Sequence, residues 1–448
     1  MASFAASRRS DAESVVWPQV VLVLSVLALT LIGFVMIYSA SQVSILSDAA
    51  SAGTLSDANP AEYLFDQLKF AIIGVVAAFL LWRFAPPEVW KGVGLWIVYA
   101  IAIGLLILTA AMGTTALGAQ RWLVLGPISL QPSEFAKIAF VLMAARILSD
   151  AQEGVLEGKM LIGQIIVLLI VPIAFLYETQ SDLGTTIIIF IGILSVMWLG
   201  EVSMRSILLL LGVAFVLALV ATFGTGYRTD RLVVYNPWGD GENGYGDGYQ
   251  TIHSFYAFAE GGIFGVGLGN SREKFDYLPE AETDFVFSII GEELGMIGAL
   301  LVIALFLALL FAGLRIARAS NSRFGSMVAG SCTIMIVFQA FLNIGCVIGL
   351  VPTTGKPLPF VSSGGSSLIA TFIMVGLILS VAKYADTTTV YDRRRANLRV
   401  VRAVDDDQPY ERPRFTDDGT RSSSSRRARG ARDDAAALAA RSRRTQRR

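Results

Sequence analysis

Four short stretches of the chain place ionisable groups at the edges of long apolar runs, where charges are costly and therefore usually functional. They carry the pair Glu134 and Lys137, the carboxylates Asp182 and Asp284, and the ammonium group of Lys356. Two kinds of chemistry suit such groups: cations that bind an anion, and a carboxylate that accepts a proton. Their order along the chain does not by itself indicate which of them meet in space.

The first two stretches each allow a structural and a functional interpretation. Glu134 and Lys137 lie close to the start of an apolar run and can pair on one face of a helix. Alternatively, Lys137 and Arg121 would together bind an anion, near the outer leaflet if the apolar runs span a membrane. Asp182 can cap the helix that follows it, or it can stand as a carboxylate at the mouth of a cavity. The sequence leaves both pairs of alternatives open.

The third stretch ends a long polar segment at Thr283 and Asp284, and either residue can cap the apolar helix that follows. Glu292 and Glu293 come later in that helix, about 12 Å deeper at the helical rise per residue. Neither therefore forms a carboxylate dyad with Asp284. Any catalysis at this point relies on Asp284 as a lone base, helped by a cation or by arginines.

The fourth stretch, Pro352–Ser367, has too many prolines and glycines to continue a helix. Irregular backbone at membrane depth is tolerated only where it is buried in protein or lines a cavity. Its N–H groups, together with Lys356, would hold phosphate oxygens, and Ser366 would open the last helix.

The composition excludes several classes of protein. Of the 448 residues, 54% are hydrophobic and 16% are charged, and the formal net charge is zero; the mean hydropathy is +0.60. These values argue against a cytosolic enzyme and give no overall field for binding nucleic acid. One histidine and two cysteines disfavour a multi-histidine metal site, a Ser-His-Asp triad and a disulfide framework.

Ten apolar runs are long enough for transmembrane helices, each of which needs about 20 residues. We therefore expect an all-α integral membrane protein with spans near residues 19–41, 68–84, 93–112, 132–148, 160–177, 183–200, 206–224, 284–313, 327–350 and 366–384. Lys and Arg concentrate in alternate loops, so the positive-inside rule places these loops and both termini in the cytoplasm. The large loop 225–283, between helices 7 and 8, then faces outward and is long enough to indicate a function.

The chain divides into three expected parts: a cytoplasmic N-terminus over 1–17, a membrane domain over 18–385 and a polar tail over 386–448. The tail is rich in Arg, Ser and Asp, cannot bury a core and is expected to be disordered in the cytoplasm. Either it is a solvated extension that enforces the topology, or it contacts anionic lipid or a cytoplasmic partner.

Several motifs occur in order between residues 18 and 385. They are Tyr38–Ser41, Gly118–Leu123, Gln131–Lys137, Gln180–Thr185, Gly267–Ser271, Leu278–Phe287, Gly291–Gly295 and Pro359–Ser367. On these motifs the chain resembles the SEDS family (shape, elongation, division and sporulation). Within that family, Gly267–Ser271 and Gly291–Gly295 are more similar to the division-type members than to the elongation-type members.

The resemblance implies a peptidoglycan glycosyltransferase that polymerises lipid II, a disaccharide-pentapeptide carried on undecaprenyl diphosphate, at the outer face of the bacterial cell membrane. It implies inverting transfer, with Asp284 matching the family's proposed general base, and a location at the division septum. The matching candidates for substrate binding are Arg121, Glu134, Lys137, Asp182, Lys356, Ser362, Gly364, Gly365 and Ser366.

The resemblance also implies what assists the reaction. A divalent cation, magnesium or manganese, would share the stabilisation of the departing diphosphate, and no organic cofactor is expected. Besides lipid II and membrane lipids, the expected partners are a class B penicillin-binding protein transpeptidase and other division proteins, and no nucleic acid.

Three residues depart from the family's usual pattern, namely Ser181 in place of proline, Glu282 in place of histidine and Ser363 in place of tyrosine. Glu282 would raise the pKa of Asp284 by like-charge repulsion.

Three alternatives to a division-type polymerase remain: an elongation-type polymerase, a scaffold that recruits a transpeptidase without catalysis, and a lipid II flippase. A flippase needs a polar path between the leaflets, whereas Arg121, Asp182, Asp284 and Lys356 all fall on the predicted outer side.

Overall fold

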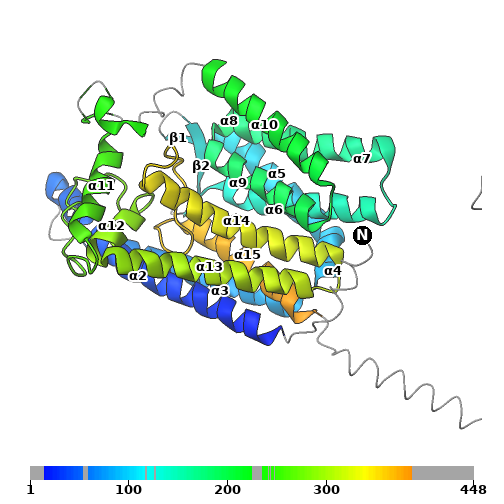
Figure 1. Cartoon of the computed structure of the whole chain (residues 1–448), viewed down its shortest axis with the longest axis horizontal. Coiled ribbons are helices and arrows are strands. Elements are labelled where there is room, and N and C mark those ends of the chain that lie inside the picture. Colours follow the sequence, from blue (N-terminus) through cyan, green and yellow to red (C-terminus); the bar gives the residue numbers. More distant parts are fainter. Residues whose placement is uncertain are drawn as a thin grey trace, which may run out of the picture. The chain divides into compact units, whose positions relative to one another are not determined.

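The computed structural model describes residues 15–53, 59–116, 119–125, 128–224, 235–240, 242, 244–246 and 248–385, so the predicted tail lies outside the described residues. The described chain is mostly helical (Figure 1). Its helices are α2 (Val16–Ala52), α3 (Glu62–Phe84), α4 (Pro87–Lys91), α5 (Val93–Met112), α6 (Pro132–Gln152), α7 (Gly158–Ile165), α8 (Val171–Gln180), α9 (Leu183–Leu199), α10 (Met204–Gly224), α11 (Tyr249–Gly261), α12 (Val286–Glu293), α13 (Gly295–Ala319), α14 (Arg323–Val347) and α15 (Gly365–Lys383).

Seven helical segments in the described part of the chain are long and apolar enough to cross a membrane. They are α2, α3, α5, α13, α14, α15 and the continuous stretch Gly158–Gln180, in which a π-helical turn joins α7 to α8. Of the other predicted spans, α9 has only 17 residues, α6 carries several charges, and α10 counts as a shorter apolar helix over Met204–Ala214. The number of ten spans therefore stays a prediction.

The prediction of one helix over 284–313 is wrong. A short helix, α12, comes first, and the apolar helix α13 begins at Gly295. Gly295 has a φ of +67°, and a Cβ at this position would collide with the backbone of Gly265, so only glycine fits the break. Phe285 occupies the N-cap position of α12 without a side-chain cap. The carboxyl of Asp284 is therefore not used as a helix cap.

A small antiparallel sheet between α5 and α6 corrects the all-α prediction. Its strands are β1 (Thr114–Ala116), β2 (Ala119–Leu125) and β3 (Ile128–Leu130), in the spatial order β1-β2-β3. The strands contain β-branched residues and one aromatic residue, Trp122, which favour extended pairing. A search for long apolar runs does not detect strands this short.

Two helices form the centre of the bundle. In the most apolar 18-residue stretch of α14 and of α15, 78% of the residues are buried. The corresponding share is 22% in α3 and 11% in Gly158–Gln180. α15 packs along α3 and α14, α13 packs along α2 and α14, and α6 and α9 also contact α14 (Figure 1). Small residues allow close approach, since a Cβ at Gly376 would lie 2.7 Å from the Cα of Ala78. The central helices are thus a rigid support for whatever the irregular segments carry.

The end of the predicted outer loop is tied to α12 and α2 by two buried carboxylates. Glu292 accepts a hydrogen bond from the Ser271 hydroxyl at 2.5 Å. Glu293 lies 3.0 Å from the Lys274 ammonium and accepts a hydrogen bond from the Ser39 hydroxyl at 2.7 Å. Both carboxylates are engaged by these partners, as expected for residues that form no dyad with Asp284.

Candidate active site

Charged groups from three of the four predicted stretches meet in one buried cluster. The Nζ of Lys356 lies 2.8 Å from Oδ2 of Asp182 and 3.6 Å from Oε1 of Glu134, and the Nζ of Lys137 lies 2.6 Å from Oε2 of Glu134. All four side chains are at most 2% exposed. Two carboxylates and two ammonium groups make a neutral set, which is the condition under which buried charges are tolerated. We call these four residues the charge cluster.

Local structure explains three members of the charge cluster. Pro132 begins α6, and helical spacing then puts Glu134 and Lys137 on one face, so the predicted pair is confirmed. Asp182 caps α9, since its Oδ1 accepts a hydrogen bond from the N–H of Thr185 at 3.0 Å. Its second oxygen contacts Lys356, so the same carboxylate serves the cap and the charge cluster.

The two cluster members that lie outside the helices stabilise each other's charged form. Burial by itself raises the pKa of Asp182, but the Lys356 ammonium and the hydrogen bonds from Lys356 and Thr185 outweigh burial and lower the pKa to about 2. Burial by itself lowers the pKa of Lys356. The carboxylates of Asp182 and Glu134 have the larger opposite effect, so the pKa of Lys356 is raised above its ordinary value. Both groups are therefore ionised at neutral pH.

Arg121 does not join the charge cluster. Its Nε donates to the carbonyl of Gln180 at 3.0 Å, and its Nη2 donates to the carbonyl of Ser181 at 2.9 Å. These carbonyls end α8, where a helix leaves acceptors unsatisfied. Arg121 therefore holds the turn that carries Asp182. The sequence predicted Arg121 as an anion ligand, whereas in the structure it supports this turn.

Glycine at position 184 makes room for the charge cluster. A Cβ at Gly184 would lie 2.7 Å from Cγ and 3.0 Å from Cε of Lys356. The ammonium end of that lysine is fixed by Asp182, so its stem has little freedom to move aside. Steric crowding by Lys356 thus explains why glycine occupies this position in the motif Gln180–Thr185.

We expect Gly184→Ala to displace the Lys356 stem, to lower the free energy of unfolding by about 1–3 kcal/mol through overpacking, and to reduce activity. Thermal unfolding in detergent and an activity assay measure the two effects. Gly104→Ala on α5 is the matched control, because nothing lies within 4 Å of the added Cβ there. An active, fully stable Gly184→Ala protein would contradict the steric argument.

Two buried amides on α14 hold the irregular segment, and neither is among the residues predicted for the site. Gln339 accepts from the Lys137 ammonium at 2.8 Å and donates to the carbonyl of Pro357 at 3.0 Å. Asn343 donates to the carbonyls of Asp284 and Lys356 at 2.7 and 2.9 Å. Their position in the sequence could have indicated a role, because both are polar amides inside an apolar run.

The predicted phosphate-binding segment uses several of its donors within the protein. The N–H of Ser362 donates to the carbonyl of Leu358 at 3.0 Å, and the N–H of Gly364 donates to the amide oxygen of Gln67, on α3, at 3.3 Å. The Ser366 hydroxyl accepts from the N–H of Gln131 at 2.9 Å. The candidates for an anion are the first N–H groups of α15, which begins at Gly365, and the ammonium of Lys356, which carries three donors and is already paired with Asp182.

Asp284 lies beside the charge cluster but outside it. Its side chain is half-buried, and its Oδ2 would be 3.5 Å from a Cβ at Gly355, the neighbour of Lys356. Burial is the main reason that its pKa is raised, to about 6; the carboxylate of Glu280 raises the pKa further and Lys356 lowers it. A neighbouring carboxylate that raises the pKa of Asp284 is thus Glu280, and the effect of Glu282 stays a prediction. A carboxyl with this pKa can exchange a proton near neutral pH.

The described residues do not form a ready site for the divalent cation that the sequence predicts. Among them, no group of three or more His, Cys, Asp or Glu side chains is arranged to hold a metal ion. The carboxylates of Asp182 and Glu134 instead contact ammonium groups. The divalent cation therefore stays a prediction.

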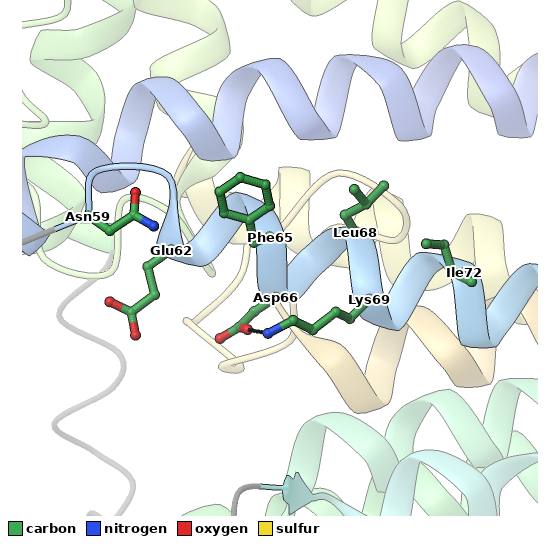
Figure 2. Close-up of a pocket in the computed structure, with 7 residues that line it drawn as sticks. All are labelled: Asn59, Glu62, Phe65, Asp66, Leu68, Lys69 and Ile72. Carbon is green, nitrogen blue, oxygen red and sulfur yellow. Dashed lines mark hydrogen bonds and ion pairs between the residues drawn. The ribbon is translucent and has the colours of Figure 1, made fainter.

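A separate pocket of about 420 Å³ lies on the outward face of α3 and contains none of the predicted site residues. Asn59, Glu62, Phe65, Asp66, Leu68, Lys69 and Ile72 line it, with an ion pair between Asp66 and Lys69 (Figure 2). Both charged groups of that pair are largely exposed. The pocket therefore lacks the buried charge that marks the candidate site.

Comparison with known proteins identifies the family. The model of the cell cycle proteins FtsW, RodA and SpoVE matches residues 19–387. Stage V sporulation protein E of Bacillus subtilis is 38% identical over 387 residues, which cover 82% of this chain and 98% of that protein. The probable peptidoglycan glycosyltransferase FtsW of Geobacter metallireducens is 36% identical over 364 residues, which cover 81% and 94%.

A solved structure has the same fold. In the structure described as "Structural coordination of polymerization and crosslinking by a peptidoglycan synthase complex", one chain aligns with a TM-score of 0.62 and 27% identity. The alignment covers 81% of this chain and 96% of that one. The motifs, the helical fold and these matches agree: the chain belongs to the SEDS family, the cell cycle proteins FtsW, RodA and SpoVE.

Proposed function

We propose that the chain is a peptidoglycan glycosyltransferase that polymerises lipid II at the outer face of the bacterial cell membrane during division. The observation that carries the proposal is the position of Asp284, a half-buried carboxyl of raised pKa next to the Gly355–Lys356 backbone and the charge cluster. The similarity to a probable peptidoglycan glycosyltransferase FtsW supports the reaction class.

In the proposed reaction, the carboxylate acts as the base and the cationic and N–H groups stabilise the leaving group. Asp284 accepts the proton of the acceptor sugar's 4-OH while that oxygen attacks the anomeric carbon of the donor. A glycosidic bond forms, the bond from the anomeric carbon to the diphosphate oxygen breaks, and the configuration inverts. Undecaprenyl diphosphate leaves with the bonding electrons. Lys356 and the N–H groups at the start of α15 stabilise the charge of the leaving group.

The neutral charge cluster gives the other predicted ligands a defined task in this proposal. Asp182 and Glu134 orient Lys356, while Lys137 is held against Glu134 and Gln339. Diphosphate binding adds negative charge beside a set that is already balanced. We therefore propose that Lys356 stays paired with Asp182 and that its ammonium, which carries three hydrogens, also contacts the bound diphosphate.

We also propose the ten-span topology with both termini in the cytoplasm. Basic residues of several helices lie together at one end, which supports it: Lys91 pairs with Glu153 at 2.6 Å, and the Lys383 ammonium donates to the carbonyl of Arg83 at 2.9 Å. The positive-inside rule assigns that end to the cytoplasm, so the charge cluster falls on the outer side.

The proposed partner is a class B penicillin-binding protein transpeptidase, together with other division proteins at the septum. The similarity to a chain of a solved peptidoglycan synthase complex that couples polymerization and crosslinking supports this choice. Similarity to an FtsW and to a sporulation protein favours a division-type role over an elongation-type one.

The test is glycan polymerisation from lipid II by the purified chain, with and without its transpeptidase partner, in parallel with translocation of fluorescent lipid II in proteoliposomes. We expect strands in the first assay. Translocation without strands, in a reaction whose positive control works, would overturn the proposal in favour of a flippase. Partner capture with neither activity would leave a scaffold.

The pH dependence of strand formation follows from Asp284. Because its pKa is raised to about 6, mainly by burial, its carboxyl is largely protonated near pH 5 and largely ionised near pH 7. A general base works only when ionised, so we expect the rate to rise through pH 6 and then level off. Initial rates measured across this range test the expectation. A rate that is already maximal at pH 5 would contradict the assigned base.

A further inference from the structure

One amide on the central helix α14 joins the two reacting segments. Asn343 is 2% exposed, and its Nδ2 donates to the backbone carbonyls of Asp284 and Lys356 at 2.7 and 2.9 Å. A primary amide nitrogen carries two hydrogens, so each carbonyl receives one. The reversed orientation would point Oδ1 at two carbonyl oxygens and is excluded by repulsion. The hydrogen bonds therefore define how the amide is placed.

We propose that Asn343 is a positioning residue that sets the spacing between the base residue Asp284 and the cation residue Lys356. This inference rests on the proposed function and adds to it a residue that touches neither substrate nor reacting atoms. Asn343 acts on the two backbones, and through them on the directions from which the carboxyl and the ammonium approach the substrates.

The two segments need an external anchor because neither is held by regular structure. Asp284 lies between α11 and α12, and Lys356 lies in the irregular stretch between α14 and α15. Backbone of this kind lacks the repeating hydrogen bonds of a helix, so its position depends on side chains that reach it. α14 is among the most buried helices, and an amide fixed to it gives both segments one common reference.

The spacing has an electrostatic consequence that can be measured. Lys356 lowers the pKa of Asp284 against the larger effect of burial and against the carboxylate of Glu280. If the anchor is lost and the two segments separate, this lowering weakens. The pH at which strand formation rises then moves upward. A residue that merely fills space in α14 has no such effect.

The experiment compares wild type with Asn343→Leu, which keeps the branching and the number of side-chain heavy atoms and removes both hydrogen bonds. We expect kcat to fall about 100-fold, the scale of a displacement of about 1 Å at a reacting centre, and the rising limb of the pH profile to shift to higher pH. Thr333→Val is the matched control on the same helix. It removes a buried hydrogen bond, which the Thr333 hydroxyl donates to the carbonyl of Ala329 at 2.7 Å. Thr333 lies ten residues before Asn343 along α14, away from both segments. It should keep wild-type rates and an unchanged limb.

The outcomes separate this inference from the proposed function. Strands from wild type, with an unchanged pH limb in Asn343→Leu and a rate loss no greater than that of the control, would overturn the positioning role alone. No strands from wild type with its partner would overturn both. If Asn343→Leu does not fold, Asn343→Ser replaces it under the same criteria, because its single hydroxyl donor cannot serve two carbonyls.

Discussion

Asp284→Asn is expected to reduce lipid II polymerisation by about 10²- to 10⁴-fold, the contribution of a positioned general base, while the protein stays folded. Asparagine has nearly the same shape but cannot accept the proton. The carboxyl does not cap α12, where Phe285 is the N-cap residue without a side-chain bond, so its loss removes no helix-ending interaction. Strand length on gels, thermal unfolding and partner capture are the measurements.

The control for this prediction is Glu280→Gln, which removes the nearby carboxylate that raises the pKa of Asp284 after burial. Glu280 is exposed, and its substitution should leave polymerisation intact at neutral pH. Because like-charge repulsion is lost, the rising limb of the pH profile should move to lower pH. Full activity in Asp284→Asn would remove Asp284 from the mechanism. A loss of both activity and partner capture would indicate misfolding.

The second large effect is expected at Lys356. Lys356→Met leaves the buried carboxylate of Asp182 without its ammonium partner, at 2.8 Å in the native protein. Breaking a buried ion pair by removing one partner costs about 3–5 kcal/mol of stability, and the proposed anion ligand is lost as well. We expect strand formation to disappear. Thermal unfolding and the polymerisation assay measure the two effects separately.

The double variant Asp182→Asn/Lys356→Met distinguishes a structural ion pair from a functional cation. Asparagine is also a good N-cap residue, so α9 keeps its cap while the unpaired charge is removed. Much of the lost stability should return, because the two substitutions act on one interaction. Activity should not return. Recovery of both stability and strand formation would show that Lys356 is structural only.

A buried ammonium elsewhere serves as the matched control for these variants. Lys274, near the end of the predicted outer loop, lies 3.0 Å from Glu293 and is 4% exposed. The double variant Lys274→Met/Glu293→Gln removes a pair of the same kind and should retain strand formation. An equal loss of activity there would mean that any buried pair is needed, and the assignment of Lys356 would fail.

Local features of the candidate site could be predicted from the sequence. The Glu134–Lys137 pair follows from helical spacing, and the cap at Asp182 follows from residue type at a helix start. The separation of Glu292 and Glu293 from Asp284 follows from the helical rise. Each of these depends on residues a few positions apart, where backbone geometry alone fixes the distances.

The sequence could not predict the contacts that join distant segments. Lys356 and Asp182 meet across 174 positions, and Asn343 reaches Asp284 across 59. The break at Gly295 depends on the backbone of Gly265, and the use of the Gly364 N–H depends on Gln67 from another helix. Such contacts are set by how helices pack, which no local pattern contains.

The sequence by itself thus determined that this is a helical, membrane-type chain of the SEDS family with Asp284 as its candidate base, because hydrophobic runs and ordered motifs are properties of the chain. Only the tertiary structure decided which charges neutralise each other, which donors remain for a substrate and which amide holds the reacting segments. The physical reason is that buried charges and amides need partners, and packing alone chooses them.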